Sequence, residues 1–249
     1  MNSLIRACPK LCSKLLLTPR PEISQAHLNT KGLCAFSMTY GAHKLFPLVG
    51  GVKSMADSAK EIASFIDEVS SKTGAPKVDI VGHSEGGVMT LYVPLTQSGT
   101  ASKIERTVAL GPAVHGAKYY GLTDLVWLGG DVTASMVEKV LRTFGAPAMA
   151  EMATGGAVHE TFQQATGKIV QPGVKASIVM SRHDILVKPE TSVVNEEGVR
   201  NLYVQDYCPQ DRVGHSGLAT DKSVWGIVEN ELLEKYDEEV TTCEAGKPI

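Results

Sequence analysis

Short apolar runs bounded by glycine or proline recur along the chain and predict strands. The first clear run covers residues 33–39 (LCAFSMT), between Gly32 and Gly41. Such runs are typical of strands that are buried in a sheet. The further runs are residues 78–81, 107–110, 176–180 and 202–205.

Helical spacing of apolar residues separates these runs. Over residues 54–73 apolar side chains recur every three or four positions, Ser54 is suited to cap the first turn, and Gly74 ends the helix. Similar patterns predict helices over residues 85–93 and 222–236. Strands that alternate with helices imply βαβ units, so we expect an α/β protein with a mostly parallel sheet.

One stretch breaks this alternation. Residues 117–172 are rich in Gly, Ala and Met and carry two loose helical patterns. We expect them to form an insertion over the sheet, as a cap or lid. Because the strands and helices alternate on both sides of this insertion, we predict that residues 1–249 form a single domain. Residues 1–27 are its atypical N-terminal part.

Composition excludes several classes of protein. The 249 residues are 43% hydrophobic and 20% charged, which is typical of a globular protein and not of a disordered, collagen-like or coiled-coil chain. The net charge of −3 gives no basic excess, so we expect no nucleic-acid partner. No apolar run approaches the roughly 20 residues that span a bilayer, so we expect no membrane span.

The strongest local signal is the sequence GHSEG at residues 82–86, which fits the pattern G-x-S-x-G. A predicted strand enters this motif and a predicted helix leaves it, which is the context of a nucleophile elbow. Ser84 is therefore the candidate nucleophile. The backbone N–H of Glu85, at the start of the helix, is a candidate donor to an oxyanion, and we expect the Glu85 carboxylate to cap that helix.

A serine nucleophile requires a base and an acid that orients the base. In α/β-hydrolases the acid and then the histidine follow the serine along the chain. Asp184 comes just after the strand predicted at 176–180, and His215 lies in a loop before the last helix. Asp206 and Asp211 remain alternatives for the acid.

The other histidines lack such a context. His83 is too close to Ser84 along the chain to act as its base, and His115 could line a pocket. His183 precedes the candidate acid. No motif surrounds the remaining ones, His27, His43 and His159.

These motifs, in this order, resemble the class 2 lipases of the α/β-hydrolase fold, which include actinobacterial triacylglycerol lipases and the fungal lipase B type. The segments that carry the resemblance are residues 31–36, 77–87, 110–116, 184–189, 205–209 and 214–218. The resemblance implies a secreted serine esterase or lipase that acts on acylglycerol-like or other carboxylic esters, without a metal or a cofactor. Its partners would be a small ester or lipid substrate and, transiently, a lipid interface.

The resemblance also implies a pattern of disulfides. Cys208 would pair with Cys243, and Cys34 would pair with Cys8 or Cys12. The five cysteines show no paired C-x-x-C motif with histidines, so we expect no structural zinc site.

The chain departs from this family before Ser84. Relatives carry a longer N-terminal region with a strand and a His-Gly or Pro-Gly turn, whose N–H is the second oxyanion donor. Here the candidate strand is residues 14–18, and Pro19 and Pro21 leave only Thr18 or Arg20 as donors. Without this strand, the strand that carries the elbow would lack a neighbour in the sheet.

Two alternatives therefore stay open. Either the oxyanion loop has been rebuilt, or the chain is shortened by a wrong start. The second function to consider is that of a catalytically impaired hydrolase-fold protein that binds a lipid or a protein and lacks half of the oxyanion hole. Acyl transfer or thioester hydrolysis by the same triad is a further possibility. The location is similarly open, because residues 1–21 hold no apolar run of about 7–15 residues, as a signal peptide would. We expect secretion from the resemblance, and a cytoplasmic location if Met1 is the true start.

Overall fold

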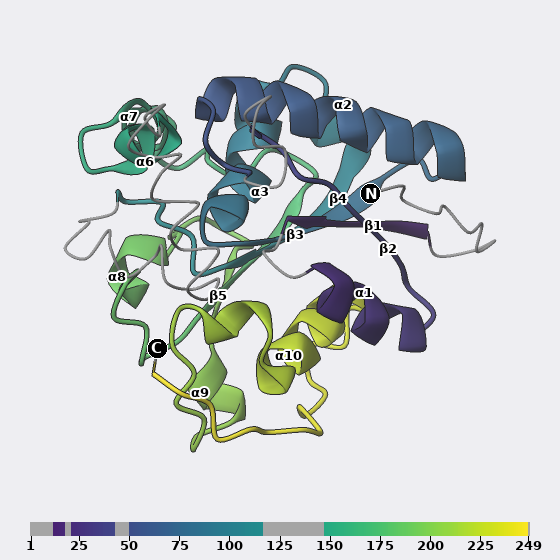
Figure 1. Ribbon diagram of the computed structural model, residues 1–249, viewed down its shortest axis with the longest axis vertical. Coiled ribbons are helices and arrows are strands. Elements are labelled where there is room, and N and C mark those ends of the chain that lie inside the picture. Colours follow the sequence, from purple (N-terminus) through teal and green to yellow (C-terminus); the bar gives the residue numbers. More distant parts are fainter. Residues whose placement is uncertain (1–11, 18–20, 43–49, 117–146, 249) are drawn as a thin grey trace.

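The computed structural model describes residues 12–17, 21–42, 50–116 and 147–248 (Figure 1). The first part of the expected cap, residues 117–146, lies outside these ranges. The described part of that insertion, residues 147–172, holds two helices, α6 (Pro147–Met152) and α7 (Ala157–Gln164).

Six parallel strands form one sheet in the order β2-β1-β3-β4-β5-β6. Their bounds are β1 (Cys12–Leu17), β2 (Cys34–Ser37), β3 (Val78–His83), β4 (Ile104–Leu110), β5 (Lys175–Met180) and β6 (Arg200–Tyr203). Together with the helices on both faces, this confirms the expected α/β-hydrolase fold class.

The candidate strand near the N-terminus is present as β1. It lies between β2 and β3, and Leu16 is paired with Ser37 on one side and with Val81 on the other. The elbow strand β3 therefore has neighbours on both sides, β1 and β4. The missing neighbour that the short N-terminal part suggested is not a feature of this protein.

Helices cover both faces of the sheet, as Figure 1 shows. On one face lie α2 (Met55–Thr73) and α3 (Glu85–Thr96), and on the other lie α1 (Pro21–Thr30) and α10 (Lys222–Leu232). Single-turn elements complete the described chain: α8 (Pro189–Ser192), α9 (Val204–Tyr207), η1 (Ala101–Lys103) and η3 (Gly217–Ala219).

The α2 boundaries follow the capping rules. Ser54 Oγ accepts a hydrogen bond from the Asp57 N–H at 3.1 Å. At the other end Gly74 has φ +71° and donates its N–H to the Ser70 carbonyl. Both predicted ends of this helix are thereby confirmed.

Several predicted boundaries differ from the structure. The strand predicted at 33–39 covers Cys34–Ser37, the helix predicted at 85–93 continues to Thr96, and the strand predicted at 107–110 begins at Ile104. Two further boundaries are wrong for a visible reason. The run at residues 202–205 crosses from β6 into α9, because the chain turns into a helix at Val204. The last helix ends at Leu232 rather than near Tyr236, because Glu234 has φ +58° and the Lys235 N–H turns back to the Asn230 carbonyl.

The alternation of side chains along the strands divides the core into two clusters. In β3, Ile80 packs toward α2 and α3, and Val81 packs toward α10 on the opposite face. Both side chains are fully buried. Because each face is covered by helices, the strands are apolar on both sides, which explains their continuous apolar runs.

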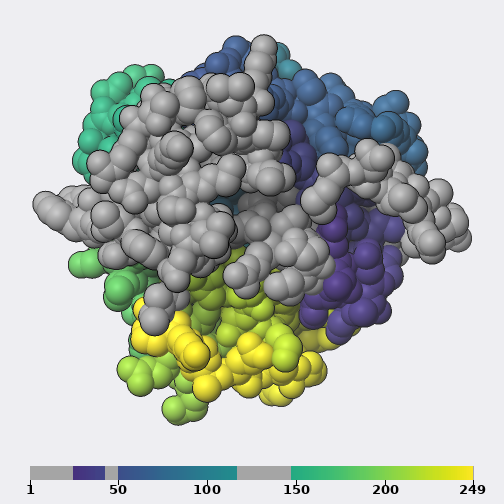
Figure 2. Space-filling view, in the orientation of Figure 1, coloured from purple at the N-terminus to yellow at the C-terminus, as the bar shows by residue number. Residues whose placement is uncertain are grey.

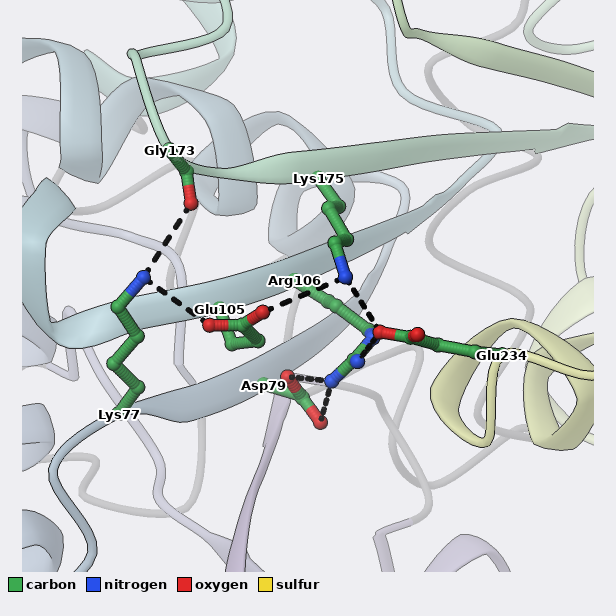
Figure 3. A network of polar contacts seen from close by, with 7 residues as sticks. All are labelled: Lys77, Asp79, Glu105, Arg106, Gly173, Lys175 and Glu234. Atoms are coloured by element: carbon green, nitrogen blue, oxygen red, sulfur yellow. Dashed lines mark hydrogen bonds and ion pairs between the residues drawn. The ribbon is translucent and has the colours of Figure 1, made fainter.

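Charged side chains join the amino-terminal parts of β3, β4 and β5 (Figure 3). Asp79 is 2% exposed, and one of its carboxylate oxygens lies 3.3 Å from Nη1 of Arg106. Arg106 also contacts Glu234, whose carboxylate lies 2.6 Å from Lys175 Nζ. A buried carboxylate without a cation would be strongly destabilising, so the pairing with Arg106 is required for Asp79 to be buried at the amino-terminal end of the sheet, opposite the elbow.

Candidate active site

The strand β3 ends in a sharp turn that carries Ser84. Ser84 has φ +56° and ψ −117°, and Glu234 is the only other residue besides glycine with positive φ in the described ranges. The backbone is held in this conformation from both sides: the Ser84 N–H donates to the Leu110 carbonyl at 2.9 Å, and the Ser84 carbonyl accepts from Val88 at 3.0 Å. Strained backbone that neighbouring elements hold in place is typical of a functional site.

The glycine before the turn is required by crowding. A Cβ on Gly82 would lie 2.1 Å from the Gly86 carbonyl oxygen, because the helix α3 starts directly against the end of β3. The G-x-S-x-G pattern thus reflects a close approach of strand and helix, and it presents the Ser84 hydroxyl at the carboxyl end of the sheet.

The imidazole of His215 reaches this hydroxyl from a loop between α9 and η3. His215 Nε2 lies 2.8 Å from Ser84 Oγ, and the residue is 1% exposed. The two residues are far apart along the chain, and the loop brings them within hydrogen-bond distance.

The acid in contact with this imidazole is Asp184. Its Oδ2 lies 2.6 Å from His215 Nδ1, while its Oδ1 accepts the N–H groups of Leu186 and Val187 at 2.9 and 2.8 Å. The carboxylate is therefore fixed by its own loop and turned toward His215. Both oxygens of this buried carboxyl group therefore have hydrogen-bond partners.

The alternative acids are engaged elsewhere. Asp206 pairs with Arg182 at 2.6 Å. Asp211 accepts the Val213 N–H at 2.9 Å and is fully buried. The structure thus brings together Ser84, His215 and Asp184, and leaves out the two other candidates.

Sequence reasoning missed the role of His83. Its Nε2 lies 2.8 Å from the carbonyl oxygen of His215, and the two rings are 4.9 Å apart at an angle of 42°. Burial, followed by the proximity of His215, lowers the pKa of His83 to about 3. His83 is therefore a neutral ring in contact with the candidate base, and no local motif indicated this contact.

Gln205 was also missed as a link between the two loops of the site. Its side chain accepts the Arg182 N–H at 2.9 Å, next to the acid loop, and donates to the Asp211 carbonyl at 2.9 Å, next to the histidine loop. It donates as well to Ser181 Oγ at 3.0 Å. Because the buried Gln205 amide is hydrogen-bonded to the backbone of both loops, it fixes the distance between them.

The Glu85 carboxylate does not cap α3 as expected. It hydrogen-bonds to the Tyr40 hydroxyl instead, and a Cβ on Gly51 would lie 2.7 Å from one of its oxygens. The reason is that Tyr40 and Gly51 lie against the Glu85 side chain at the start of α3. Burial, assisted to a lesser extent by the nearby Glu151, raises the pKa of Glu85 to about 8, and the Tyr40 hydrogen bond opposes part of this shift.

Two predicted features fall outside what the structure describes. Thr18 and Arg20, the candidates for the second oxyanion donor, lie outside the described residues, as does the first part of the expected cap. The backbone N–H of Glu85 follows the nucleophile in α3, as expected. In the described ranges no group of three His, Cys, Asp or Glu side chains is arranged to hold a metal ion.

The disulfide expected between Cys208 and Cys243 is present, with 5.5 Å between the Cα atoms. Cys34 is also disulfide-bonded. Cys8 and Cys12, the two partners expected for it, lie outside the described side chains. Across the described ranges no helix combines the length and the apolar composition that crossing a bilayer requires.

Comparisons with known proteins bear on the family and the fold. Residues 22–118 match the model of the family Lipase (class 2). Lipase B of Aspergillus fumigatus superposes with a TM-score of 0.69 at 13% identity, covering 100% of this chain and 56% of that protein. The chain thus spans little more than half the length of that lipase.

Two further structures match over most of their own length. A monoacylglycerol lipase of Paleococcus ferrophilus has a TM-score of 0.59 at 15% identity, with 93% of this chain and 96% of that one covered. MGS-MChE2, an α/β hydrolase enzyme from a metagenome of lagoon sediments, has a TM-score of 0.58 at 12% identity, with 91% and 92% covered. At these identities the likeness establishes a shared fold.

Proposed function

Since the chain belongs to the class 2 lipase family, we propose that it hydrolyses carboxylic esters, with acylglycerol-like lipids as the substrate class. In this proposal Ser84 is the nucleophile, His215 the general base and acid, and Asp184 the residue that orients the imidazole. The observation that carries the proposal is the continuous contact from Asp184 Oδ2 through both His215 nitrogens to Ser84 Oγ, at 2.6 and 2.8 Å.

The chemistry proceeds in two halves. In the first, His215 Nε2 takes the Ser84 hydroxyl proton as Oγ bonds to the ester carbonyl carbon, and the same proton then passes to the departing alcohol. In the second, His215 takes a proton from water, whose oxygen attacks the acyl-enzyme, and returns that proton to Ser84 Oγ. The products are an alcohol and a carboxylic acid.

Electrostatic stabilisation accompanies both halves. The Asp184 carboxylate offsets the positive charge that His215 carries after each proton transfer. The Glu85 N–H, at the start of α3, faces the negative charge that develops on the carbonyl oxygen. The family places a second donor after the strand that corresponds to β1, and Thr18 and Arg20 remain the candidates in this chain.

The test is hydrolysis of p-nitrophenyl butyrate and p-nitrophenyl palmitate by the purified chain, with Ser84→Ala as the control. We expect turnover that depends on Ser84, and the ratio of the two rates separates an esterase from a lipase. A fluorophosphonate probe should label the wild type and not Ser84→Ala. If folded wild-type protein neither hydrolyses the esters nor reacts with the probe, the proposal is wrong and the chain is a hydrolase-fold binding protein.

The proposal extends to location. Disulfides persist mainly in oxidising compartments, and both the Cys208–Cys243 bridge and the bonded Cys34 suit secretion. Thiol alkylation without prior reduction, followed by mass spectrometry of protein from its native source, tests this. Alkylated Cys208 and Cys243 would contradict it.

A further inference from the structure

The C-terminal segment, residues 243–247, returns to the loop that carries His215. After α10 the chain runs along the lower side of the molecule in the orientation of Figure 1 and passes α9, and Figure 2 shows it at the surface in yellow. The Arg212 N–H donates to the Ala245 carbonyl at 2.9 Å, and the Gly214 N–H donates to the Lys247 carbonyl at 2.7 Å. The segment thus pairs with the residues that immediately precede His215.

This segment is anchored independently of these two hydrogen bonds. At its start Cys243 is bonded to Cys208, which directly follows α9. The Glu244 N–H donates to Ser223 Oγ at 2.8 Å, and its carboxylate lies 3.0 Å from Lys222 Nζ. A covalent link to α9 and polar links to the start of α10 therefore fix where the segment meets the histidine loop.

Gly246 makes the contact with that loop especially close. It has φ +55°, and a Cβ on it would lie 2.1 Å from Asp211 Oδ1 and 2.4 Å from the Val213 nitrogen. Asp211 is fully buried and accepts the Val213 N–H at 2.9 Å. Any side chain at position 246 must displace either the segment or the residues just before His215.

We propose that residues 243–247 are a positioning element for His215, which holds the imidazole between Ser84 and Asp184 from the outer side of the loop. Gln205 and His83 contact the same loop from within. The proposal rests on the proposed function, in which His215 is the base. His215 lies between Gly214 and Gly217, and glycine gives a loop little stiffness of its own, so its conformation depends on these contacts.

The consequence is kinetic. A displacement of about 1 Å in a catalytic group can reduce the rate about 100-fold. Loosening this segment should therefore lower kcat, while KM, which depends on the substrate pocket, should change little. A purely structural role would lower stability without this selective effect on kcat.

The first test compares Gly246→Ala with Gly198→Ala. Gly198 also has positive φ, +79°, but a Cβ on it would meet no atom within 4 Å, so it controls for backbone strain alone. We expect Gly246→Ala to lower kcat by about 10- to 100-fold with KM within about twofold, and Gly198→Ala to leave both unchanged. Equal effects of the two substitutions, or wild-type kcat in Gly246→Ala, would overturn the proposal.

Two further measurements apply if Gly246→Ala fails to fold or the wild type proves inactive. The double variant Cys208→Ser with Cys243→Ser releases the anchor without adding atoms, and it should speed amide exchange at Arg212 and Gly214. The downfield Nδ1 proton resonance of His215, which reports its hydrogen bond to Asp184, should weaken in that variant. Unchanged exchange and an unchanged resonance contradict the positioning role, whereas absent Ser84-dependent turnover in the wild type contradicts only the proposed function.

Discussion

His83 Nε2 lies 2.8 Å from the carbonyl oxygen of His215, so the residue before the nucleophile contacts the backbone of the candidate base. Since a carbonyl only accepts, Nε2 of His83 carries the hydrogen. Burial and the nearby His215 lower the pKa of His83 to about 3, so this ring remains neutral during the proton transfers that the proposed mechanism assigns to His215. His83 thus holds the backbone of His215 in place and adds no positive charge of its own beside the His215 ring.

We expect His83→Phe to lower kcat/KM about tenfold and to destabilise the fold by about 1–3 kcal/mol, because the buried His215 carbonyl would lose its donor. His83→Gln keeps an N–H donor and should restore most of both. Steady-state kinetics and urea denaturation measure the two effects. If Phe and Gln behave alike, the hydrogen bond has no part in placing His215.

The same histidine should make the fold sensitive to acid. Between about pH 6.5 and pH 3 the unfolded chain binds a proton at His83 that the native protein does not, so the free energy of unfolding falls as pH falls. The expected slope is up to about 1.4 kcal/mol per pH unit. Urea midpoints of the wild type and His83→Gln across this range measure it, and an identical pH dependence in both would contradict the prediction.

Glu85 should have the opposite effect. Its pKa is raised from 4.5 to about 8, so the native protein keeps a proton that the unfolded chain loses, and stability falls as pH rises through this window. We expect Glu85→Gln to become more stable than the wild type by up to about 1.4 kcal/mol per pH unit from pH 4.5 to 8. Glu238→Gln, at an exposed carboxylate, is the control. A constant difference between Glu85→Gln and the wild type would show that Glu85 is ionised in the native state.

Asp184→Asn tests the acid. Its two N–H acceptor contacts at Oδ1 can persist, but an amide opposite His215 Nδ1 favours the wrong tautomer of the imidazole. We expect kcat to fall by about 10⁴-fold with little loss of stability. Asp206→Asn, at the exposed ion pair with Arg182, is the matched control and should retain activity. Comparable losses in both variants would mean that Asp184 has no special role.

The parts of the site that follow local rules were predictable from the sequence. The elbow at Ser84 is specified by glycines at a close approach of strand and helix, and the chain order of acid and histidine selected Asp184 and His215. The contact of His83 with His215 was not predictable, because it joins residues far apart along the chain through a side chain and a carbonyl. The orientation of the Glu85 carboxylate depends on its contacts with Tyr40 and Gly51, which are distant along the chain and which no periodicity encodes.

The same distinction applies to the fold. The ends of α2 were predicted because capping is local. Residues 14–18 were only a candidate strand, and the structure places β1 at Cys12–Leu17. The single-turn helices α8 and α9 are too short to show a periodicity. The end of β6 at Tyr203 was missed because the apolar run continues into α9.

The order of the strands bears on how the protein resists self-association. In the described sheet the outermost strands, β2 and β6, have four residues each, whereas the strands between them have six or seven. A long unpaired edge is a template on which another chain can add a strand, and short edge strands limit that hazard. Because β1 lies between β2 and β3, its backbone N–H and C=O groups are paired on both sides and cannot template the addition of another chain. The two outermost strands of the described sheet are its shortest.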